Sequence, residues 1–418
     1  MKIAFVSQPL DKVVPPNQNS IGIWTYQIAR RLGQQHEVLI YLSTRRKSEE
    51  VEATERFQYR YIRIRKNRIF QIFDRLLTPL LNGDQPVPSF DFASLLFCLK
   101  VAWDLKRHRC KIVHIHNFSQ FAPLIRFFNP QARIVIHMHC EWLTQLDPQM
   151  IGSRLRQVDL ILGVSEYITK KVRARFPQMA GKCRTIFNGV DIDQFWRAHE
   201  RPAQENPDHR LLFTGRVSPE KGIHDLIEAY KLVAMRDPHT SLHIVGDTAS
   251  LPKEFLVNLS EESQVAGLTA FYDGNYLDHL RQQIPLELQD RVTFYGFVPS
   301  SKIASHYQTA DILINPSYSE SFGMSLVEAM ASEVPVVATR VGGMIEIVTE
   351  GETGLLVERG DTRALAEALV YLLRRDELRL SMGQKGRARV LACYSWERIS
   401  EKLLEYYVEL EDLQQRVQ

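Results

Sequence analysis

The sequence lacks three features that would by themselves decide its class: long apolar runs, paired cysteines and a large net charge. Among its 418 residues, no run approaches the roughly 18 consecutive apolar residues of a membrane-spanning helix. The formal net charge is only +3, so we expect no nucleic-acid partner. The cysteines form no CxxC pair, which argues against a disulfide framework or a structural zinc site and favours a reducing compartment. They are Cys98, Cys110, Cys140, Cys183 and Cys393.

Two nucleotide-binding motifs are also missing. The chain has no GxGxxG dinucleotide fingerprint, and no Gly-Lys-Ser/Thr sequence that would end a Walker A loop. Its N-terminal Met-Lys-Ile-Ala-Phe-Val-Ser is too short for a signal peptide and is typical of a first buried strand, so we expect a cytoplasmic protein. The apolar fraction of 44% and the charged fraction of 24% are ordinary for a globular protein.

Short β-branched runs alternate with amphipathic segments in both halves of the chain, which predicts an α/β fold with parallel sheets. A polar, proline-containing segment at 195–209 is interpreted as a linker between two doubly wound domains. Residues 248–290 are longer than one crossover needs, which indicates an insertion. The predicted strands are 3–6, 38–42, 112–115, 134–136 and 160–164 before the linker, and 211–214, 242–245, 292–295, 312–314 and 334–338 after it. The predicted helices include 21–32, 92–106, 166–175 and a last one from about 396.

One segment with two glutamates offers a ligand site. A strand is predicted to end near Ile314, a loop runs through Glu320 and Gly323, and a helix begins near Met324. Ligands of open α/β sheets bind at the carboxyl ends of strands, and the free amides of a helix start favour phosphate there. Glu320 and Glu328 can accept hydrogen bonds from sugar or ribose hydroxyls. The alternative is that Glu320 caps the helix and Glu328 is solvated.

A second segment supports the phosphate interpretation. The sequence Gly-Arg-Val-Ser-Pro-Glu-Lys-Gly follows the first predicted strand of the second domain and runs from Gly215 to Gly222. It places two cations, Arg216 and Lys221, in one glycine-bounded turn. Such a pair is suited to neutralising a diphosphate leaving group.

Four elements occur in order: Asn188-Gly-Val-Asp, the Gly-Arg-x4-Lys-Gly turn, Gly296-Phe-Val, and Glu-x7-Glu with Ser-Phe-Gly. Together they resemble the GT4-type glycosyltransferases of GT-B fold, over essentially the whole chain. This resemblance implies two Rossmann-like domains that face each other across a cleft. Residues 1–195 would form the acceptor-side domain, with the C-terminal helix at about 396–418 packing back on it, and residues 210–395 would form the nucleotide-sugar-binding domain.

The resemblance also implies roles for matching residues. The catalytic set would be Glu320, His139, Arg216 and Lys221, with His139 facing the donor sugar and His137 as the second choice for that role. The donor-binding set would be Gly22, Gly215, Arg216, Lys221, Gly246, Phe297, Val298, Glu320, Ser321, Phe322, Gly323, Met324, Ser325 and Glu328. Gly22 is a weaker match, since the family has more glycine in that loop. Asp247 resembles a lining position beside Gly246.

The resemblance implies a metal-independent enzyme without a cofactor, in which Arg216 and Lys221 replace a cation. Asp191-Ile-Asp193 is formally a DxD sequence, but its place after Asn-Gly-Val favours a turn. His114 and His116 are expected to be structural or to face the acceptor. We do not expect the four histidines to form a metal site, since their loops would serve different strand ends.

The function implied is transfer of a hexose, with retention, from a UDP-sugar, with UDP-glucose the first choice and GDP-mannose the second. The acceptor would be a saccharide or a lipid-linked saccharide of cell-envelope polysaccharide synthesis. Two alternatives stay open: a sugar-nucleotide epimerase or hydrolase of the same fold, and a non-catalytic nucleotide-sugar-binding subunit. The apolar stretch at 70–81 lies behind basic residues of 56–68, and a second basic cluster lies at 170–175. These segments are either ordinary packed and solvated surfaces or peripheral contacts with the inner face of a membrane.

Overall fold

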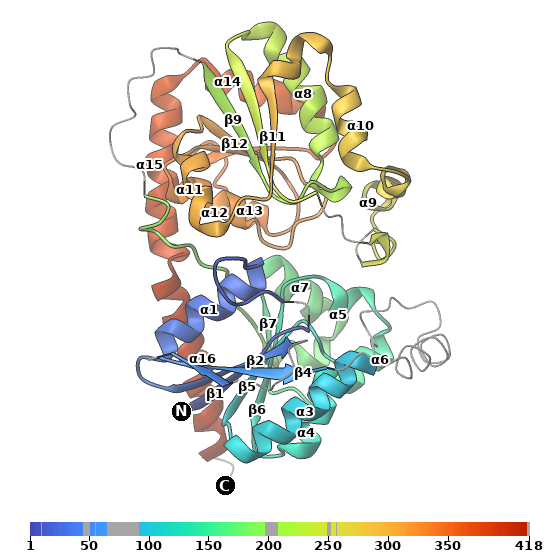
Figure 1. Ribbon diagram of the computed structural model, residues 1–418, viewed down its shortest axis with the longest axis vertical. Helices are drawn as coiled ribbons and strands as arrows, with labels where there is room; N and C mark the ends of the chain where they lie inside the picture. The colour runs from blue at the N-terminus through green and yellow to red at the C-terminus, as the bar shows by residue number, and fades with distance from the viewer. Residues whose placement is uncertain are drawn as a thin grey trace. The chain divides into compact units, whose positions relative to one another are not determined.

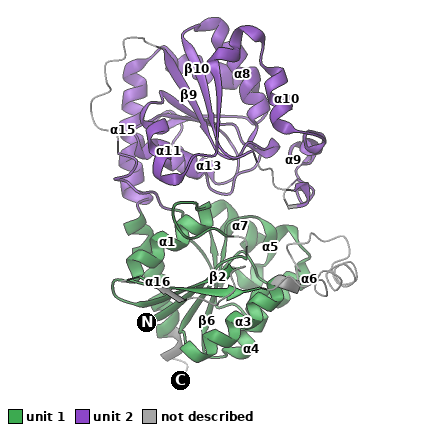
Figure 2. Cartoon of the chain, viewed as in Figure 1, with its two compact units in different colours: residues 1–188, 396–418 green, residues 189–395 purple. Residues whose placement is uncertain are grey.

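The computed structural model describes residues 1–9, 11–44, 51–54, 56–64, 92–196, 208–248, 252–255 and 257–415. They form two compact units, which Figure 2 shows in green and purple. Unit 1 contains Met1–Asn188 and Trp396–Gln418, and unit 2 contains Gly189–Ser395. The stretch at 70–81 lies outside the described residues, as does the middle of the predicted linker.

Unit 1 is built on a sheet of eight described strands in the order β3-β4-β2-β1-β5-β6-β7-β8, with β3 as an antiparallel edge strand and the others parallel. The order reverses between β1 and β5, as in a doubly wound fold (Figure 1). The strands are β1 Lys2–Val6, β2 Glu37–Thr44, β3 Val51–Ala53, β4 Gln58–Arg63, β5 Ile112–His116, β6 Arg133–Met138, β7 Leu160–Gly163 and β8 Cys183–Thr185. The helices are α1 Ser20–Leu32, α3 Phe92–His108, α4 Phe121–Phe128, α5 Trp142–Gln145, α6 Pro148–Leu155, α7 Glu166–Arg175 and α16 Trp396–Gln415, with the 3-10 helix η2 Pro177–Lys182.

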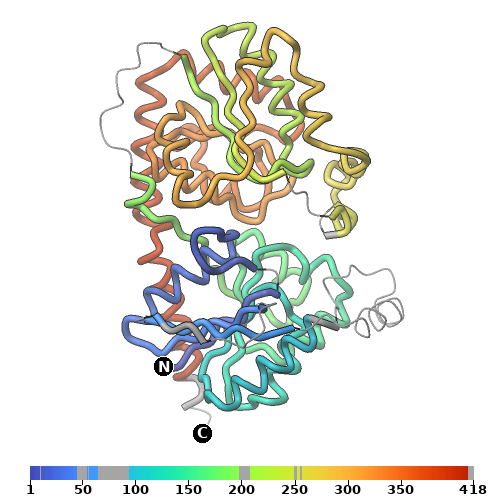
Figure 3. The backbone as a smooth tube through the Cα atoms, viewed as in Figure 1, coloured from blue at the N-terminus to red at the C-terminus, as the bar shows by residue number. Residues whose placement is uncertain are grey.

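Helices α1 and α16 pack together on the core of unit 1, although they lie at opposite ends of the chain (Figure 3). From α1, Trp24 and Ile28 are fully buried, and from α16 so are Leu403 and Tyr407. They join Phe5 of β1 in one apolar cluster. Burial of each large apolar side chain contributes about 1.5–3 kcal/mol to folding, so this cluster ties the C-terminal helix to unit 1.

Unit 2 has six described strands, all parallel, in the order β11-β10-β9-β12-β13-β14. Its order reverses between β9 and β12. The strands are β9 His209–Thr214, β10 Thr240–Val245, β11 Val292–Gly296, β12 Ile312–Asn315, β13 Val336–Thr339 and β14 Gly354–Val357. The helices are α8 Ile223–Arg236, α9 Ser263–Ala266, α10 Tyr276–Gln283, α11 Ser300–Gln308, α12 Met324–Ala331, α13 Met344–Ile347, α14 Thr362–Leu373 and α15 Asp376–Cys393. The 3-10 helices are η3 Pro219–Lys221, η4 Lys253–Phe255, η5 Gly267–Tyr272 and η6 Leu286–Arg291.

Alternate residues of the unit 2 strands serve two layers of helices. Phe213 and Ile244 belong to the cluster that α8, α10 and α14 cover. Outside that cluster, α12 packs against α15 and α11. Each predicted strand in both halves is present within a residue or two, which confirms the α/β expectation. The expected insertion at 248–290 contains short helices from η4 to η6.

The chain passes between the units at Asn188–Gly189 and Ser395–Trp396, the first crossing lying a few residues before the predicted linker. Gln194, just before that linker, and Trp196, within it, pack on other parts of unit 2. Gln194 donates to the Ser300 carbonyl at 2.5 Å, and the guanidinium of Arg387 lies 3.7 Å from the ring centre of Trp196. These contacts hold the segment against unit 2, so a polar, proline-containing composition does not mark the crossing point here.

Candidate active site

The loops after β9 and β12 meet where the strand order of unit 2 reverses. Gly222 ends the first loop with a positive φ of 67°, and a Cβ there would lie 2.1 Å from the Pro316 carbonyl oxygen. Only glycine allows this approach. Ligands of doubly wound sheets bind at such a reversal, and this one brings Lys221 beside Glu320.

Lys221 and Glu320 form an ion pair across 99 residues of sequence, with 2.6 Å between Nζ and Oε2. Their side chains are 17% and 19% exposed, so the pair is largely withdrawn from water and weakly screened. Burial alone would raise the pKa of Glu320. The charge and hydrogen bond of Lys221, the Phe322 amide and the charge of Arg216 together lower that pKa below its ordinary value. Glu320 is therefore an ionised hydrogen-bond acceptor, and the proposal that it merely caps the helix is not needed to explain it.

Arg216 is paired with Glu220, a buried residue that the sequence analysis did not single out. Glu220 is 1% exposed and accepts hydrogen bonds from Ser218 at 2.6 Å and Tyr272 at 3.1 Å. Arg216 donates to the same carboxylate at 3.3 Å, while its buried Nε has no partner among the described residues. The signal for Glu220 was its place between the two cations of the turn, where a buried acid can orient an arginine.

The start of α12 presents main-chain donors to the same region. Gly323 is the N-cap, with a φ of 113°, and no side chain caps the helix. Phe322 is 3% exposed and packs edge-on against Tyr394, and the Ser325 hydroxyl accepts from the Asn315 amide at 3.2 Å. The free amides at this uncapped helix start are suited to an anion, and the Ser325 hydroxyl keeps a hydrogen that it can donate. Ser321 and Met324 flank them and are partly buried.

Glu328 lies in the second turn of α12 and is not freely solvated, which corrects the alternative interpretation. It accepts a hydrogen bond from the Tyr307 hydroxyl at 2.5 Å, and Tyr307, fully buried, also bonds to Thr214. Burial raises the pKa of Glu328 to about 7, against the opposing effect of the Tyr307 hydrogen bond. Tyr307 was not predicted, since a tyrosine in an amphipathic helix carries no signal that it will meet a carboxylate.

Two further strand ends join this edge of the sheet. The Gly246 amide, after β10, donates to the Gly296 carbonyl at 2.9 Å, and a Cβ on Gly246 would lie only 1.6 Å from the Gly215 carbonyl oxygen. Phe297, next to Gly296, is 54% exposed and can contact a ligand. Val298 follows it and is partly buried. The structure thus brings the predicted residues of unit 2 to the ends of β9, β10, β11 and β12. Asp247 extends the β10 end, where its carbonyl accepts from the Val217 amide at 2.8 Å.

Two of the predicted site residues, Gly22 and His139, belong to unit 1. Gly22 is buried in the first turn of α1, where a Cβ would lie 1.9 Å from the Lys12 carbonyl oxygen. Its lack of a side chain therefore has a packing reason, and its donor-binding role stays a prediction. His139 follows β6 and is partly exposed, whereas His137 is fully buried under Trp24, with ring centres 4.8 Å apart. Of the two histidines, His139 is the one that can meet a ligand.

The four histidines His114, His116, His137 and His139 form one cluster in and after β5 and β6, contrary to the expectation that their loops serve different strand ends. His116 pairs with His137 in the parallel register, and the ring centres of His137 and His139 are 4.0 Å apart. One nitrogen from each of His114, His116 and His137 lies within 4.8 Å of the others. However, both nitrogens of His116 are used, by Thr25 and by His139. The prediction that no metal is bound stays a prediction.

The structure also bears on the expectations for the DxD sequence, the cysteines and membrane-spanning helices. Asp191 accepts from the amides of Asp193 at 3.2 Å and Gln194 at 3.0 Å, so the DxD sequence forms the expected turn. All five cysteines are free thiols. Among the described residues, no helix has both the length and the apolar character to cross a membrane.

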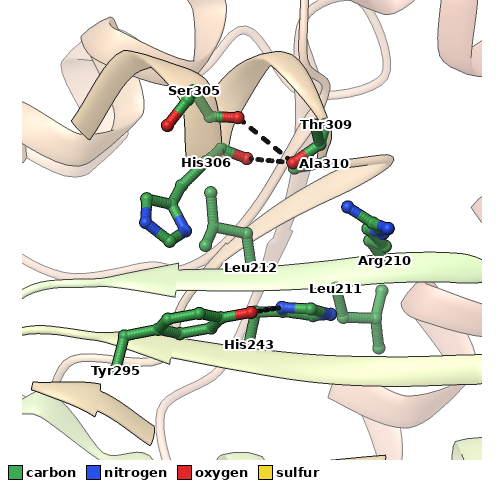
Figure 4. Close-up of a pocket in the computed structure, with 9 residues that line it drawn as sticks. All are labelled: Arg210, Leu211, Leu212, His243, Tyr295, Ser305, His306, Thr309 and Ala310. Atoms are coloured by element: carbon green, nitrogen blue, oxygen red, sulfur yellow. Dashed lines mark hydrogen bonds between the residues drawn. The ribbon is translucent and has the colours of Figure 1, made fainter. Parts of the chain in front are cut away.

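A pocket of about 240 Å³ lies elsewhere in unit 2, between α11 and the sheet (Figure 4). It is lined by Arg210, Leu211, Leu212, His243, Tyr295, Ser305, His306, Thr309 and Ala310. Tyr295 stacks on His243 and donates or accepts one hydrogen bond with it at 2.8 Å. None of the predicted donor residues lines this pocket.

Comparison with known proteins agrees with this arrangement. Residues 21–194 match the model of Glycosyltransferase Family 4, and residues 194–389 match that of Glycosyl transferases group 1. Spore coat protein SA of Bacillus subtilis is 26% identical over 325 residues, which are 73% of this chain and 80% of that protein. Lipopolysaccharide 1,2-N-acetylglucosaminetransferase of Salmonella typhimurium is 25% identical over 417 residues, 97% of each chain.

Two solved structures share the fold. Sucrose-phosphate synthase from Thermosynechococcus elongatus has a TM-score of 0.74 and 22% identity, covering 99% of each chain. Anabaena HepE in complex with UDP and glucose has a TM-score of 0.69 and 20% identity, covering 97% of this chain and 99% of that one. With two Rossmann-like units of GT-B type and family models that match both, the chain belongs to the GT4-type glycosyltransferases and is a transferase enzyme.

Proposed function

We propose that the protein transfers a hexose from a nucleotide-diphosphate sugar to a saccharide or lipid-linked acceptor, with retention at the anomeric carbon. The observation that carries the proposal is the group of Arg216, Lys221 and Glu320 where the strand order of unit 2 reverses. Two cations beside uncapped helix amides suit a diphosphate, and an ionised carboxylate suits hydroxyl groups.

The chemistry needs little more than charge and position. As the bond between the anomeric carbon and the phosphate oxygen breaks, negative charge grows on the diphosphate. Arg216, Lys221 and the α12 amides stabilise it. The departing phosphate takes the proton of the acceptor hydroxyl while that oxygen bonds to the same face of the sugar. Because two fixed cations stand at the diphosphate, we propose that the reaction requires no metal ion and no cofactor.

For the donor we propose a UDP-sugar, UDP-glucose first, with GDP-mannose second. Complexes of the structural neighbour HepE with UDP and glucose support this order, since its fold matches this chain throughout. Glu328 would accept from the ribose hydroxyls, and the exposed Phe297 would lie beside the base. The Salmonella relative's name supports a saccharide acceptor in envelope polysaccharide synthesis.

A donor screen tests the proposal. Thermal unfolding is followed with UDP-glucose, UDP-N-acetylglucosamine, GDP-mannose, UDP and GDP, and free nucleotide release is then measured with and without saccharide acceptors. A shift with a UDP-sugar and acceptor-dependent UDP release are expected. Nucleotide release without acceptor would favour a hydrolase, an isomerised donor would favour an epimerase, and binding without turnover would favour a non-catalytic subunit.

For location we propose the cytoplasmic side of a membrane, with peripheral contact through α3 and α4. Trp103 is 53% exposed and Phe127 is 78% exposed, and α3 ends in the cations Lys106 and Arg107. Aromatic side chains beside cations suit an anionic lipid surface. By contrast, three cations of the predicted basic runs are used within unit 1: Arg60 pairs with Asp104, Lys171 with Glu141 and Arg173 with Glu166.

Vesicle sedimentation separates these surfaces. Wild-type protein should co-sediment with anionic vesicles at low salt, and Trp103→Ala/Phe127→Ala should not. Equal sedimentation of both proteins, or none of either, would exclude the α3–α4 surface.

A further inference from the structure

A chain of three side chains connects α1 to the residue expected to face the donor sugar. Thr25 lies in α1, His116 ends β5 and His139 follows β6. The Thr25 Oγ1 lies 3.0 Å from His116 Nε2, and His116 Nδ1 lies 3.0 Å from His139 Nε2. Thr25 and His116 are fully buried, and His139 is partly exposed.

The direction of the first hydrogen bond follows from a backbone carbonyl. The Thr25 hydroxyl lies 2.8 Å from the Ile21 carbonyl oxygen, which can only accept. The single hydroxyl hydrogen of Thr25 is therefore used there. Towards His116 the same oxygen must accept, so Nε2 of His116 carries a hydrogen.

The direction of the second bond follows from the first. Burial and the neighbouring histidines lower the pKa of His116 well below its ordinary value, so the ring is neutral. A neutral imidazole with hydrogen on Nε2 has a lone pair on Nδ1. His139 must donate to that lone pair from its own Nε2. Burial lowers the pKa of His139 to about 3, so its Nδ1 is left without a hydrogen.

We propose that Thr25 and His116 are positioning residues that hold His139 in the Nε2–H tautomer, so that its Nδ1 accepts a hydrogen bond from a hydroxyl of the bound sugar. In this state His139 cannot donate to a phosphate oxygen. The sugar-hydroxyl part rests on the proposed function, whereas the tautomer is a property of the protein alone.

The surroundings leave the ring of His139 little other freedom. Its amide donates to the Asn117 side chain at 2.7 Å, and the Asn117 amide donates to the His137 carbonyl at 2.9 Å. Trp24 packs edge-on against His116, with ring centres 5.3 Å apart. With the main chain and the rings held, the hydrogen-bond chain decides which nitrogen of His139 is free.

Nuclear magnetic resonance of 15N-histidine-labelled protein measures the tautomer directly. The His139 signals, assigned with His139→Gln, should show the Nε2–H form in wild type and in Thr25→Ser. Thr25→Val removes the acceptor for His116, and a shift of His139 towards the Nδ1–H form is expected. His116→Phe should have the same effect. The control is Thr169→Val, another buried threonine of unit 1.

Kinetics with donor analogues that each lack one sugar hydroxyl test the consequence. One analogue should bind wild type at least about fivefold more weakly than the full donor, the size of one lost hydrogen bond. In Thr25→Val the full donor should already show that loss in KM, and the same analogue should cause no further loss. Thr25→Ser should restore the wild-type values.

An Nδ1–H form of His139 in wild type would overturn the proposal, as would a Thr25→Val protein that folds and keeps both tautomer and KM. Stoichiometric metal in the purified protein would also overturn it, because a metal on His116 takes the lone pair that His139 needs. If the tautomers are as expected but no sugar nucleotide is bound or turned over, the proposed function fails while the hydrogen-bond chain stands.

Discussion

Replacing Lys221 by methionine removes the cation of the Lys221–Glu320 pair and keeps the length of the side chain. Because both side chains are less than one-fifth exposed, Glu320 would keep a carboxylate with reduced solvation and without the cation that donates a hydrogen bond to it. We expect a loss of about 1–3 kcal/mol in the free energy of unfolding near neutral pH, the range for a buried charged group that loses its hydrogen-bond partner. Turnover of Lys221→Met should be at least about tenfold below that of wild type, which corresponds to about 1.4 kcal/mol of transition-state stabilisation.

The double variant Lys221→Met/Glu320→Gln separates stability from catalysis. Neutralising both partners removes the unpaired charge, so stability should largely return. Turnover should not return, since the diphosphate still lacks a cation and the sugar lacks its ionised acceptor. Lys231→Met is the matched control, because Lys231 forms a surface pair with Glu228 in the same unit and such pairs contribute about 0–1 kcal/mol.

The pH dependence gives a second check. In wild type the pKa of Glu320 is lower in the folded protein than in the unfolded chain. Glu320 therefore adds to the free energy of unfolding at pH values above its unfolded pKa, and this contribution is lost as the pH falls through the folded pKa. Without Lys221, burial should raise that pKa, so the deficit of Lys221→Met should be larger at about pH 8 than at about pH 5. Chemical denaturation and steady-state nucleotide release measure the two effects. Wild-type turnover in Lys221→Met, or recovery of turnover in the double variant, would refute the role given to Lys221.

Three other variants are expected to behave as follows. In wild type the donor KM should fall between about pH 6 and 8, because Glu328, with a pKa of about 7, ionises there. Glu328→Gln should show no such fall. Native Glu328 also binds its proton more tightly than the unfolded chain, so wild type should lose stability relative to Glu328→Gln as the pH rises from about 4.5 to 7. Burial lowers the pKa of His137 below its unfolded value of 6.5, so acid favours the unfolded state. In urea titrations, the free energy of unfolding of His137→Phe should therefore fall less steeply with falling pH than that of wild type. Glu220→Gln should lower turnover about threefold or more by releasing Arg216, whereas Glu228→Gln should not; equal kinetics of both variants would contradict the role of Glu220.

Much of the fold follows from local pattern. Runs such as 134–136 and 160–164 are apolar on both faces, which is typical of central parallel strands; the first lies within β6, and the second covers β7 and the residue after it. Helix α7 has the ends that its amphipathic pattern predicts, and in the structure Ser165 caps its first turn. Composition placed the linker at 195–209, whereas the contacts of Gln194 and Trp196 with Ser300 and Arg387 are tertiary and leave no sign in composition.

The site was predictable where a motif carries its own geometry. The glycine-bounded turn of Arg216 and Lys221 and the loop before α12 are local arrangements of strand end, glycine and helix start. Tyr307 and Thr25 were missed because their roles depend on partners in other elements, whereas Glu220 was missed although two of its partners, Arg216 and Ser218, lie in the same turn. Tyr307 meets Glu328 from a neighbouring helix, and nothing within either helix indicates the contact.

By itself, the sequence determined the two α/β halves, the cations of one turn and the glutamates of another, since strands, helices and glycine turns arise from nearby residues. Tertiary structure alone decided that Lys221 lies 2.6 Å from Glu320 and that the four histidines in and after β5 and β6 pack against Trp24. The physical reason is strand order. Which carboxyl ends become neighbours depends on how all the strands of a sheet compete for partners and for burial, and that competition is settled only when the whole unit has folded.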